Sequence, residues 1–526
     1  MSPRSLMRSA LLVSALYVLS NVTGFVQRAI VAGRFGGGEA LDAFYAAFRL
    51  PDLLFNVLAG GALASAFIPL FSGHLAKGET ALGWALARRV ALGVGSAVGI
   101  AALLAASRAE VLVDAVIAPG FGPSQATLTA GLMRVMLIST VIFALSGLMM
   151  GVLQSHHHFL APALAPVLYN VGIAAGAVLL GSMGIYGAAV GVVVGALMHL
   201  AVQLPTLARL IPRASPALSA SQSRQLRQDA QQVLQLMLPR VIGLAAVQVN
   251  FIVNTRLASA METGAVTALN LAFAIMILPQ AAIAQAISTV LFPAISAHAA
   301  LGDRRAFARA LSQSIAVVLA LSAPASVGLV VLGEPLIRLL FERGAFSAQN
   351  TAQTAFALQM FAVGLTAHAA LEVVTRGFYA LRDTLRPVIL AVVSMALNVA
   401  LSVALSAAFA RAGWMPFGGV ALANSLATAL ETTVLWLLLQ RREPALRAQV
   451  VLQALGRASA ASALMGLALI SWRALLGDGH TSTLFALPVG VLVYAASAWS
   501  LGSAEMHWIA AQVHARVRHP LAELKK

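Results

Sequence analysis

Apolar runs long enough to cross a lipid bilayer recur from one end of this chain to the other. A helix needs about 20 consecutive apolar residues to cross roughly 30 Å of hydrocarbon. Hydrophobic residues make up 60% of the 526 residues and charged residues only 10%, so no stretch is left over for a soluble domain. The sequence therefore predicts a polytopic membrane protein.

The runs predict an all-α fold with about fourteen transmembrane helices. They are long, rich in Leu, Ala and Val, and lack the alternation of a membrane β-strand. The first run carries no small-residue cleavage motif, so we expect a retained helix rather than a signal peptide. The expected spans are residues 10–33, 48–72, 86–107, 130–153, 160–181, 184–207, 231–256, 266–296, 310–332, 352–378, 386–410, 418–439, 452–473 and 482–504.

Basic residues are distributed unevenly between the two sides of this arrangement. The net charge is +16, and about two-thirds of Lys and Arg lie at the N-terminus, in every second loop or in the tail, as at Arg88 and Arg304. The positive-inside rule then predicts a multi-pass protein with both termini in the cytoplasm. Because no basic stripe is interleaved with aromatic residues, we expect membrane lipids as partners and no nucleic acid.

Residues that commonly carry catalysis are missing or badly placed. The chain has no cysteine, which excludes disulfides and thiol chemistry. His156 to His158 are consecutive, so their rings point in different directions, and we expect a solvated turn rather than a metal site. Neither a Walker motif, a zincin helix nor a nucleophile elbow occurs, and the sequence predicts no enzyme.

Two pairs of segments suggest an internal duplication. "AFIPLFSGHLAKGE" from Ala66 returns as "VLFPAISAHAALGD" from Val290, and "GVLQSHHHFLAP" from Gly151 returns as "GFYALRDTLRP" from Gly377. Both pairs are about 224 to 226 residues apart. The period contains an even number of expected helices, so the halves have the same orientation. We expect a parallel repeat with a pseudo-two-fold axis along the membrane normal.

The duplication predicts the domain organisation. Two six-helix lobes cover residues 1–210 and 231–440, a polar cytoplasmic linker covers 211–230, and 441–526 adds two helices and a basic tail. Two such lobes can enclose a cavity and expose it alternately to each side. A repeat kept for packing alone is the alternative, because small residues four apart suit close helix contacts, as at Gly172, Gly176, Gly187, Gly191 and Gly195.

Polar residues within the first two spans are candidates for substrate binding. Arg28 lies in the first span, and Arg49, Asp52 and Asn56 share one face at the start of the second. An arginine facing a cavity can hold a phosphate or pyrophosphate in a bidentate fork. The alternative is that these charges extend to the outer headgroups. Gly60 and Gly61, further along the second span, predict a bend or a close contact.

A second group lies in the other half of the chain. The side-chain oxygens of Asn254, Ser394, Asn398 and Thr428 could hold a sodium ion, and Glu372 lies one turn from His368 as a possible proton-linked pair. Hydrogen bonds between helices are the competing explanation. We expect no cofactor beyond a Na⁺ or H⁺ gradient or the membrane potential.

Several motifs resemble those of a known family. "GFVQRAIVAGRFGGGEALDAFYAAFRLPDLL" from Gly24, "APALAPVLYN" from Ala161, "FERGAFS" from Phe341 and "GFYALRDTLRPV" from Gly377 are similar to segments of the lipid II flippase family, called MurJ or MviN. The resemblance covers the first twelve expected helices. It implies two lobes around a cationic cavity and a lipid-facing groove made by the last two helices, as in the wider multidrug/oligosaccharidyl-lipid/polysaccharide (MOP) exporter superfamily.

The resemblance also implies an activity and a place in the cell. Members move the undecaprenyl-pyrophosphate-linked precursor of peptidoglycan across the bacterial cytoplasmic membrane, driven by the membrane potential or an ion gradient. Partners would be that lipid and, in addition, proteins of cell-wall synthesis. By the same resemblance, Asp42 matches the acidic position before the second helix, and Arg49 matches a basic one.

The chain departs from the family at other charged positions. Arg28 is adjacent to one of them, and Asn254 stands where some members have a cation-binding Asp. Uncharged residues replace expected charges at Asn21, Gln27, Phe55, Asn56, Gly60, Phe273 and Ala274. The resemblance therefore indicates a divergent member that lacks several cavity charges.

These observations predict a flippase for a polyprenyl-pyrophosphate-linked saccharide, with lipid II as the leading substrate and alternating access as the mechanism. Two alternatives remain open. One is an ion-coupled exporter of small amphiphiles or drugs from the same superfamily. The other is a membrane scaffold for cell-wall synthesis that transports nothing, which the missing arginines favour.

Overall fold

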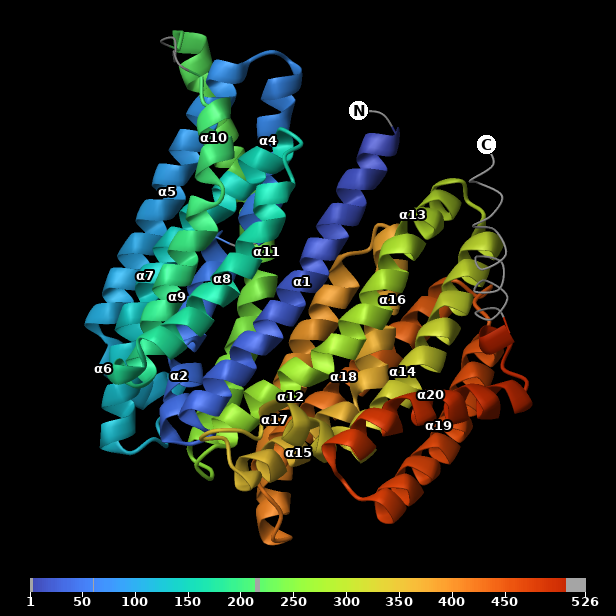
Figure 1. The fold of residues 1–526 in the computed structure, drawn as a ribbon. Helices are drawn as coiled ribbons and strands as arrows, with labels where there is room; N and C mark the ends of the chain where they lie inside the picture. The colour runs from blue at the N-terminus through green and yellow to red at the C-terminus, as the bar shows by residue number, and fades with distance from the viewer. Residues whose placement is uncertain (1–2, 60, 213–217, 508–526) are drawn as a thin grey trace. The chain divides into compact units, whose positions relative to one another are not determined.

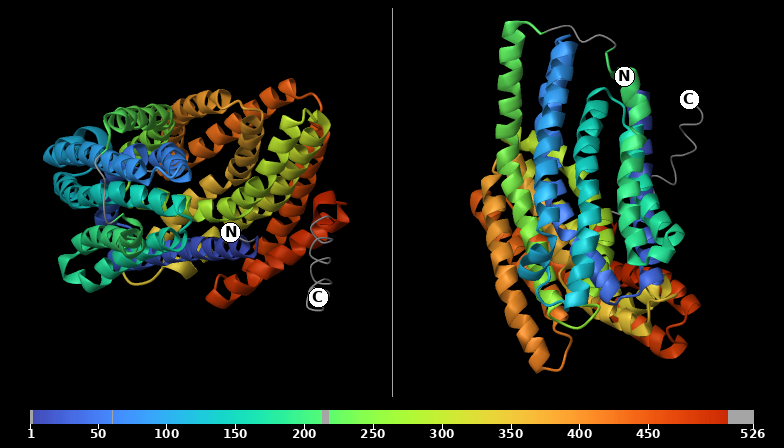
Figure 2. Two further views of the ribbon diagram at one scale, coloured as in Figure 1. Left: turned by 90° about the horizontal axis from the view of Figure 1, so that it is seen from above. Right: turned by 90° about the vertical axis from the view of Figure 1, so that its left-hand side faces the viewer.

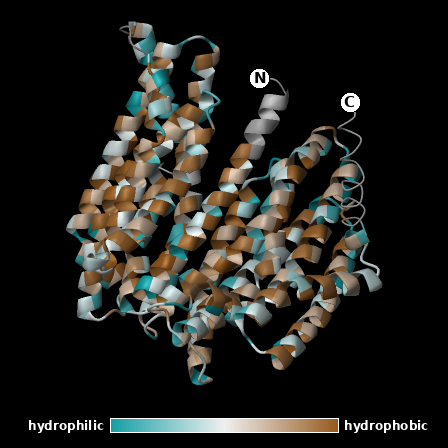
Figure 3. Ribbon diagram, in the orientation of Figure 1, coloured by the Kyte–Doolittle hydropathy of each residue, from teal (hydrophilic) through white to brown (hydrophobic). Residues whose placement is uncertain are grey.

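The computed structural model describes residues 3–59, 61–212 and 218–507. Throughout these ranges the regular structure is helical, without any strand, as Figure 1 shows. The expected all-α membrane fold is thereby confirmed. Hydrophobic residues cover the long helices, while hydrophilic residues gather towards their ends and in the turns (Figure 3).

The chain divides into two compact units, which are described separately below. The first unit comprises Met1–Thr267 with Arg343–Ser347, and the second comprises Ala268–Glu342 with Ala348–Lys526. These units differ from the expected lobes because the segment 231–267 packs with the first unit. The lobe boundaries rest on the duplication and stay a prediction.

The first unit contains α1 (Pro3–Phe35), α2 (Glu39–Ala47), α3 (Arg49–Leu54), the π-helical turn η1 (Phe55–Ala59), α4 (Gly61–Ala76), α5 (Thr80–Ser107), α6 (Ala109–Leu112), the π-helical turn η2 (Val113–Ile117), α7 (Pro123–Ser155), α8 (Leu160–Leu179), the 3₁₀ turn η3 (Gly181–Met183), α9 (Ile185–Ala201), α10 (Leu204–Leu210) and α11 (Ala220–Ser259). The two views of Figure 2 show its long helices running alongside one another.

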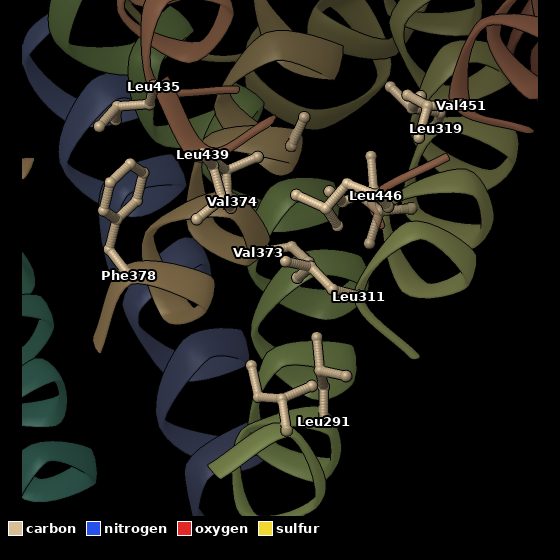
Figure 4. Packing of buried hydrophobic residues seen from close by; sticks show 14 of the residues in the cluster. Leu291, Leu311, Leu319, Val373, Val374, Phe378, Leu435, Leu439, Leu446 and Val451 are labelled. Atoms are coloured by element: carbon tan, nitrogen blue, oxygen red, sulfur yellow. The ribbon is translucent and has the colours of Figure 1, made fainter. Parts of the chain in front are cut away.

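From the second unit come α12 (Ala265–Gln280), whose first turn still belongs to the first unit, the π-helical turn η4 (Ala281–Gln285), α13 (Ala286–Ala300), α14 (Arg304–Phe341), α15 (Ala348–Ala362), α16 (Leu365–Ala380), α17 (Leu385–Arg411), α18 (Phe417–Arg442), α19 (Ala448–Leu476) and α20 (His480–Ser500). Its core includes Leu311, Val373, Phe378 and Leu439, brought together from α14, α16 and α18 (Figure 4).

The described residues contain 11 helices long and apolar enough to cross a membrane, or 12 if the bent pair α15 and α16 forms one span. The expected count of about fourteen is therefore not confirmed. The expected span 48–72 is interrupted, because α3 passes into η1 before α4 begins. Gly60, where we expected a bend, lies outside the described residues. The expected span 231–256 lies within α11 and is not among these candidates.

Helix α11 begins within the segment that we expected to be a polar loop. Its 40 residues start with a capping box in which the Ser219 hydroxyl accepts a hydrogen bond from the Gln222 N–H, while the Gln222 side chain accepts one from the Ser219 N–H. Such reciprocal bonds satisfy two amide groups that have no partner within the helix. Residues 220–230 of the expected linker are thus helical rather than a loop, and the S-x-x-Q signature was visible in the sequence, whereas the linker role of 211–230 stays a prediction.

The duplicated segments end their helices in the same way. In the first unit, Gly78 has a positive φ of 76°, and the Glu79 N–H donates to the His74 carbonyl at 2.9 Å. In the second unit, Gly302 has φ 71°, and the Asp303 N–H donates to the His298 carbonyl at 3.0 Å. Both turns are Schellman caps, which require a residue that tolerates the left-handed region.

The second pair of duplicated segments agrees equally well. His157 and Arg382 are the residues other than glycine with positive φ in the described chain, and they occupy matching places in the two turns. The π-helical turns η1 and η4 also lie about 226 residues apart. The backbone therefore repeats at the turns that follow the duplicated segments and at η1 and η4, whereas η2 and η3 have no counterpart among the described residues of the second half.

Close packing of α8 against α9 depends on glycine. A Cβ atom added to Gly172 would lie 2.3 Å from the Gly195 Cα, and one added to Gly176 would lie 2.4 Å from the Gly191 Cα. Backbones that approach this closely gain dispersion contacts that larger side chains would prevent. The packing function predicted for these small residues is confirmed.

The FERGAFS motif supplies a short turn that rests on the end of α1. The Ala345 N–H donates to the Gly33 carbonyl at 2.8 Å. Gly344 has φ 60°, and a Cβ at that position would lie 2.3 Å from the Gly33 oxygen. Facing it, Gly36 has φ 73°, and its Cβ would lie 2.7 Å from the Ala345 oxygen. Gly36 and Gly344, one from each motif, therefore allow the two backbone segments to pack this closely.

We predict that Gly344→Ala destabilises the first unit. The left-handed backbone alone costs about 1–2 kcal/mol for a residue with a Cβ, and the contact with the Gly33 oxygen adds to this. Gly38→Ala is the matched control, since a Cβ there meets nothing within 4 Å. Thermal unfolding in detergent should show a lower midpoint for Gly344→Ala alone; equal midpoints for the two variants would contradict the assignment.

Candidate functional site

Asp42 lies on α2, in the connection that follows the first span. The side chain is only 2% exposed. One carboxylate oxygen accepts a hydrogen bond from the Gly264 N–H at 2.7 Å, and the other accepts bonds from the Thr267 N–H at 2.7 Å and the Thr267 hydroxyl at 2.6 Å. Asp42 thus caps the first turn of α12, where amide groups lack partners within the helix and a negative charge is favoured.

Burial and hydrogen bonding act on the Asp42 carboxyl in opposite directions. Burial raises its pKa from 3.8 to about 6, against the lowering effect of the bonds from Thr267 and Gly264. The group is therefore ionised at neutral pH, as its three donors require. Its expected part in substrate binding stays a prediction, because both oxygens are engaged by α12.

Arg49, at the start of α3, contacts α11. Its Nε donates to the Thr255 hydroxyl at 2.6 Å, and its guanidinium carbon lies 5.5 Å from the centre of the Phe251 ring. A cation over an aromatic face is attracted by the ring quadrupole. Arg28, on α1, is half-buried, and its charge together with that of Arg49 acts on Asp52. Both arginines lie in the first unit.

Asp52 and Asn56 differ in their surroundings despite their common helical face. The Asn56 amide donates to the Asp52 backbone carbonyl at 2.8 Å. The Asp52 side chain lines a pocket of about 260 Å³ formed with α7, α8 and α9. Arg49 is held by α11 instead. Arg49, Asp52 and Asn56, which we predicted to form one binding face, therefore have three different sets of contacts.

Ser394 and Asn398, on α17, face α18. The Ser394 hydroxyl donates to the Ala427 carbonyl at 3.2 Å, as expected for a bond between helices. Asn398 is 2% exposed, and both polar atoms of its amide lack a hydrogen-bond partner among the described residues. Thr428 is also buried. Asn254 belongs to the first unit, so a shared cation site for these residues stays a prediction.

Glu372 and His368 are not joined as the expected pair. The Glu372 carboxylate accepts a hydrogen bond from Arg376 at 2.7 Å, whereas His368 Nε2 lies 3.0 Å from the Asn424 oxygen. Arg376 also lies 5.9 Å from the centre of the Phe292 ring. Sequence reasoning overlooked Arg376, although its position four residues after Glu372 in an apolar run is a recognisable signal.

The last two helices contribute to an apolar pocket in the second unit. It has a volume of about 520 Å³ and lies among α12, α14, α19 and α20, with Pro324, Leu469, Gly490 and Tyr494 in its wall. The Tyr494 hydroxyl donates to the Ala320 carbonyl on α14. Such a wall suits a hydrocarbon chain.

The three consecutive histidines end α7. His157 has φ 61° and His158 is exposed, as expected for a turn. His156, however, is half-buried and lies 6.2 Å from the Trp84 ring and 5.8 Å from the Phe71 ring. Burial lowers the pKa of His156. One of the three therefore packs against the protein instead of being solvated.

For Asp42 we predict a loss of stability in Asp42→Asn, with Glu39→Gln as the exposed control. Asn keeps the oxygen that Thr267 binds but turns an N–H group towards the Gly264 N–H, at a cost of about 1–3 kcal/mol. A raised folded-state pKa also means that wild-type stability declines as the pH rises from about 4 to about 6. Unfolding midpoints across this range should decline less in Asp42→Asn; an unchanged pH profile would contradict this.

Comparison with known proteins identifies relatives over most of the chain. The family model described as "Lipid II flippase MurJ" matches residues 31–490. The lipid II flippase MurJ of Burkholderia cenocepacia is 33% identical over 404 residues, 74% of this chain and 76% of the relative. A probable lipid II flippase MurJ of Rhizobium tropici is 30% identical over 517 residues, covering 94% and 93% of the two chains.

Solved structures share the fold. The inward closed conformation of a lipid II flippase MurJ superposes with a TM-score of 0.76 at 24% identity, covering 93% of this chain and 98% of the other. An inward-facing multidrug resistance MATE transporter of the MOP superfamily reaches 0.67 at 15% identity, covering 83% and 98%. Taken with the family match over residues 31–490, the chain belongs to the lipid II flippase MurJ family.

Proposed function

We propose that this protein moves lipid II, the peptidoglycan precursor carried on undecaprenyl pyrophosphate, from the inner to the outer leaflet of the cytoplasmic membrane. The observation that carries the proposal is the family match over residues 31–490, together with relatives that are 30% and 33% identical. The described helices support it, since 11 of them are long and apolar enough to cross a membrane. The protein is a transporter rather than an enzyme, and alternating access is its mechanism.

Arg28 and Arg49 are the residues that we assign to the pyrophosphate group. A guanidinium keeps its charge at any physiological pH and can offer two parallel N–H donors to phosphate oxygens. Both arginines are half-buried in the first unit. Arg49 reaches the pyrophosphate by giving up its bond to Thr255, at a cost that the charged ligand offsets.

The apolar pocket among α12, α14, α19 and α20 supports binding of the polyprenyl chain. Its wall is almost entirely hydrocarbon, and it includes the two helices beyond the duplicated part of the chain. Energy comes from a Na⁺ or H⁺ gradient or from the membrane potential, and proteins of cell-wall synthesis deliver or receive the lipid.

We predict that Arg28→Ala and Arg49→Ala each fail to restore growth of a bacterium depleted of its own lipid II flippase. Arg28→Lys keeps the charge but loses the fork, so we expect partial growth. Arg88→Ala, an exposed position on α5, is the control. Normal growth of both alanine variants at wild-type protein levels would contradict the assignment to the pyrophosphate.

Vesicles distinguish lipid II movement from other transport. The purified protein should move lipid II in proteoliposomes and leave cationic dyes where they are. Dye efflux without lipid II movement would favour a small-amphiphile exporter, and the absence of both would favour a scaffold.

Both termini lie in the cytoplasm in this proposal, because the positive-inside rule places the basic loops there. We predict that green fluorescent protein fused after Lys526 is fluorescent. Alkaline phosphatase inserted at Gly122, in the turn before α7, should be active, since that turn faces the periplasm. The opposite pair of results would invert the topology.

A further inference from the structure

The pocket beside Asp52 contains a second titratable group that the proposed function does not use. It has a volume of about 260 Å³, and both Asp52 from α3 and His199 from α9 line it. Thr140 and Tyr169 add hydroxyl groups, while Phe143 belongs to the apolar part of the wall. A carboxyl and an imidazole in one hollow of a membrane protein are costly, and such groups commonly mark an ion or proton pathway.

The hydrogen bonds around His199 join it to a buried polar network. The Ser146 hydroxyl lies 2.7 Å from His199 Nδ1, and the Gln203 amide nitrogen donates to the same hydroxyl at 2.7 Å. A serine oxygen has two lone pairs, so Ser146 can donate to Nδ1 or accept from it while Gln203 donates to the same oxygen. Both tautomers of the imidazole therefore fit this network, as a group that relays a proton requires.

Asp52 is the complementary group. Its carboxylate has no hydrogen-bond or ion-pair partner within the ranges that the structure describes, whereas the neighbouring Arg49 is held by Thr255 and Phe251. The Thr140 hydroxyl oxygen is buried and also lacks a partner. The pocket thus combines an unsatisfied carboxylate acceptor, an imidazole and a hydroxyl group that can bond to either.

Charged and titratable groups from several helices of the first unit surround Asp52. Arg28 on α1, Arg49 on α3 and Tyr169 on α8 interact electrostatically with it, and His199 lines the same pocket from α9. The Asp52 carboxyl group therefore lies near two cations, a phenol and an imidazole.

We propose that this pocket is a proton-binding site of the first unit, with Asp52 taking up one proton from water and releasing it again, and His199 positioned to relay it. No bond other than O–H or N–H is made or broken. A sodium ion fits less well, because hard cations need several oxygen ligands. Here His199 offers nitrogen instead of oxygen.

The wall of the pocket suggests how a proton could influence transport. Phe55 lines the pocket and begins the π-helical turn η1. Such turns occur where a helix can change its hydrogen-bonding pattern, and they are frequent at functional sites. A change of charge at Asp52, one turn before η1, acts on this irregular part of the backbone. This coupling step rests on the proposed function, whereas proton binding itself does not.

Infrared difference spectroscopy of the full-length protein tests proton binding without any substrate. Spectra at about pH 5 and about pH 8 should differ by the C=O band of a protonated carboxyl group that is lost in Asp52→Asn. Glu110→Gln is the matched control, because Glu110 is an exposed carboxylate paired with Arg134 at 3.0 Å. A band that persists in Asp52→Asn overturns the proposal.

Two further measurements test the relay by His199 and the alternative of a sodium site. His199→Gln should shift the pH at which the Asp52 band appears, and an unshifted band excludes the relay. This variant also tests the assignment of the band to the pocket if Asp52→Asn does not fold. Replacing sodium chloride with N-methyl-D-glucamine chloride should leave the band unchanged, and a change would make the pocket a sodium site instead.

Lipid II movement in proteoliposomes then tests coupling. With the membrane potential clamped, a pH gradient should stimulate the wild type and Glu110→Gln but not Asp52→Asn. Stimulation that persists in Asp52→Asn overturns the coupling. If the wild type moves no lipid II, the proposed function fails, while the infrared result still decides on proton binding.

Discussion

Every backbone N–H and C=O group in the hydrocarbon must find its partner within the protein, and the whole structure follows from this constraint. Long helices satisfy it along their own length. Departures occur where the residues after a helix cap its last carbonyl groups, as at the Schellman turns of Gly78 and Gly302, or where a helix changes to π geometry, as in η1 and η4. These irregularities recur in both halves of the duplication.

Charges face the same constraint, and several buried ones join helices. His74 is 4% exposed and lies 2.8 Å from Glu79 and 3.0 Å from Asp229, which ties the end of α4 to α11. Asp42 joins α2 to α12, and Arg49 joins α3 to α11. A buried charge without a partner is expensive. Asp52 is therefore informative, because its carboxylate opens into a pocket instead of meeting a cation.

Much of the fold could be predicted because its signals are local. Hydropathy revealed the helices, and the repeated segments revealed turns that proved equivalent in backbone conformation. The spacing of Gly172, Gly176, Gly191 and Gly195 revealed close packing. The site was predicted less well. The bond between Arg49 and Thr255 spans 206 residues, and nothing at either position announces the other. The π-helical turns have no compositional signature.

The sequence by itself determined the class of fold, the membrane setting, the duplication and the family resemblance. Each depends on the order of apolar, small and basic residues along one stretch of chain. Tertiary structure decided which polar groups meet: Asp42 with α12, Arg49 with α11, and Asp52 with His199 in one pocket. The reason is physical. An unpaired polar group in a membrane is costly, so each polar group pairs with whichever partner the packing brings near, however distant that partner is in the sequence.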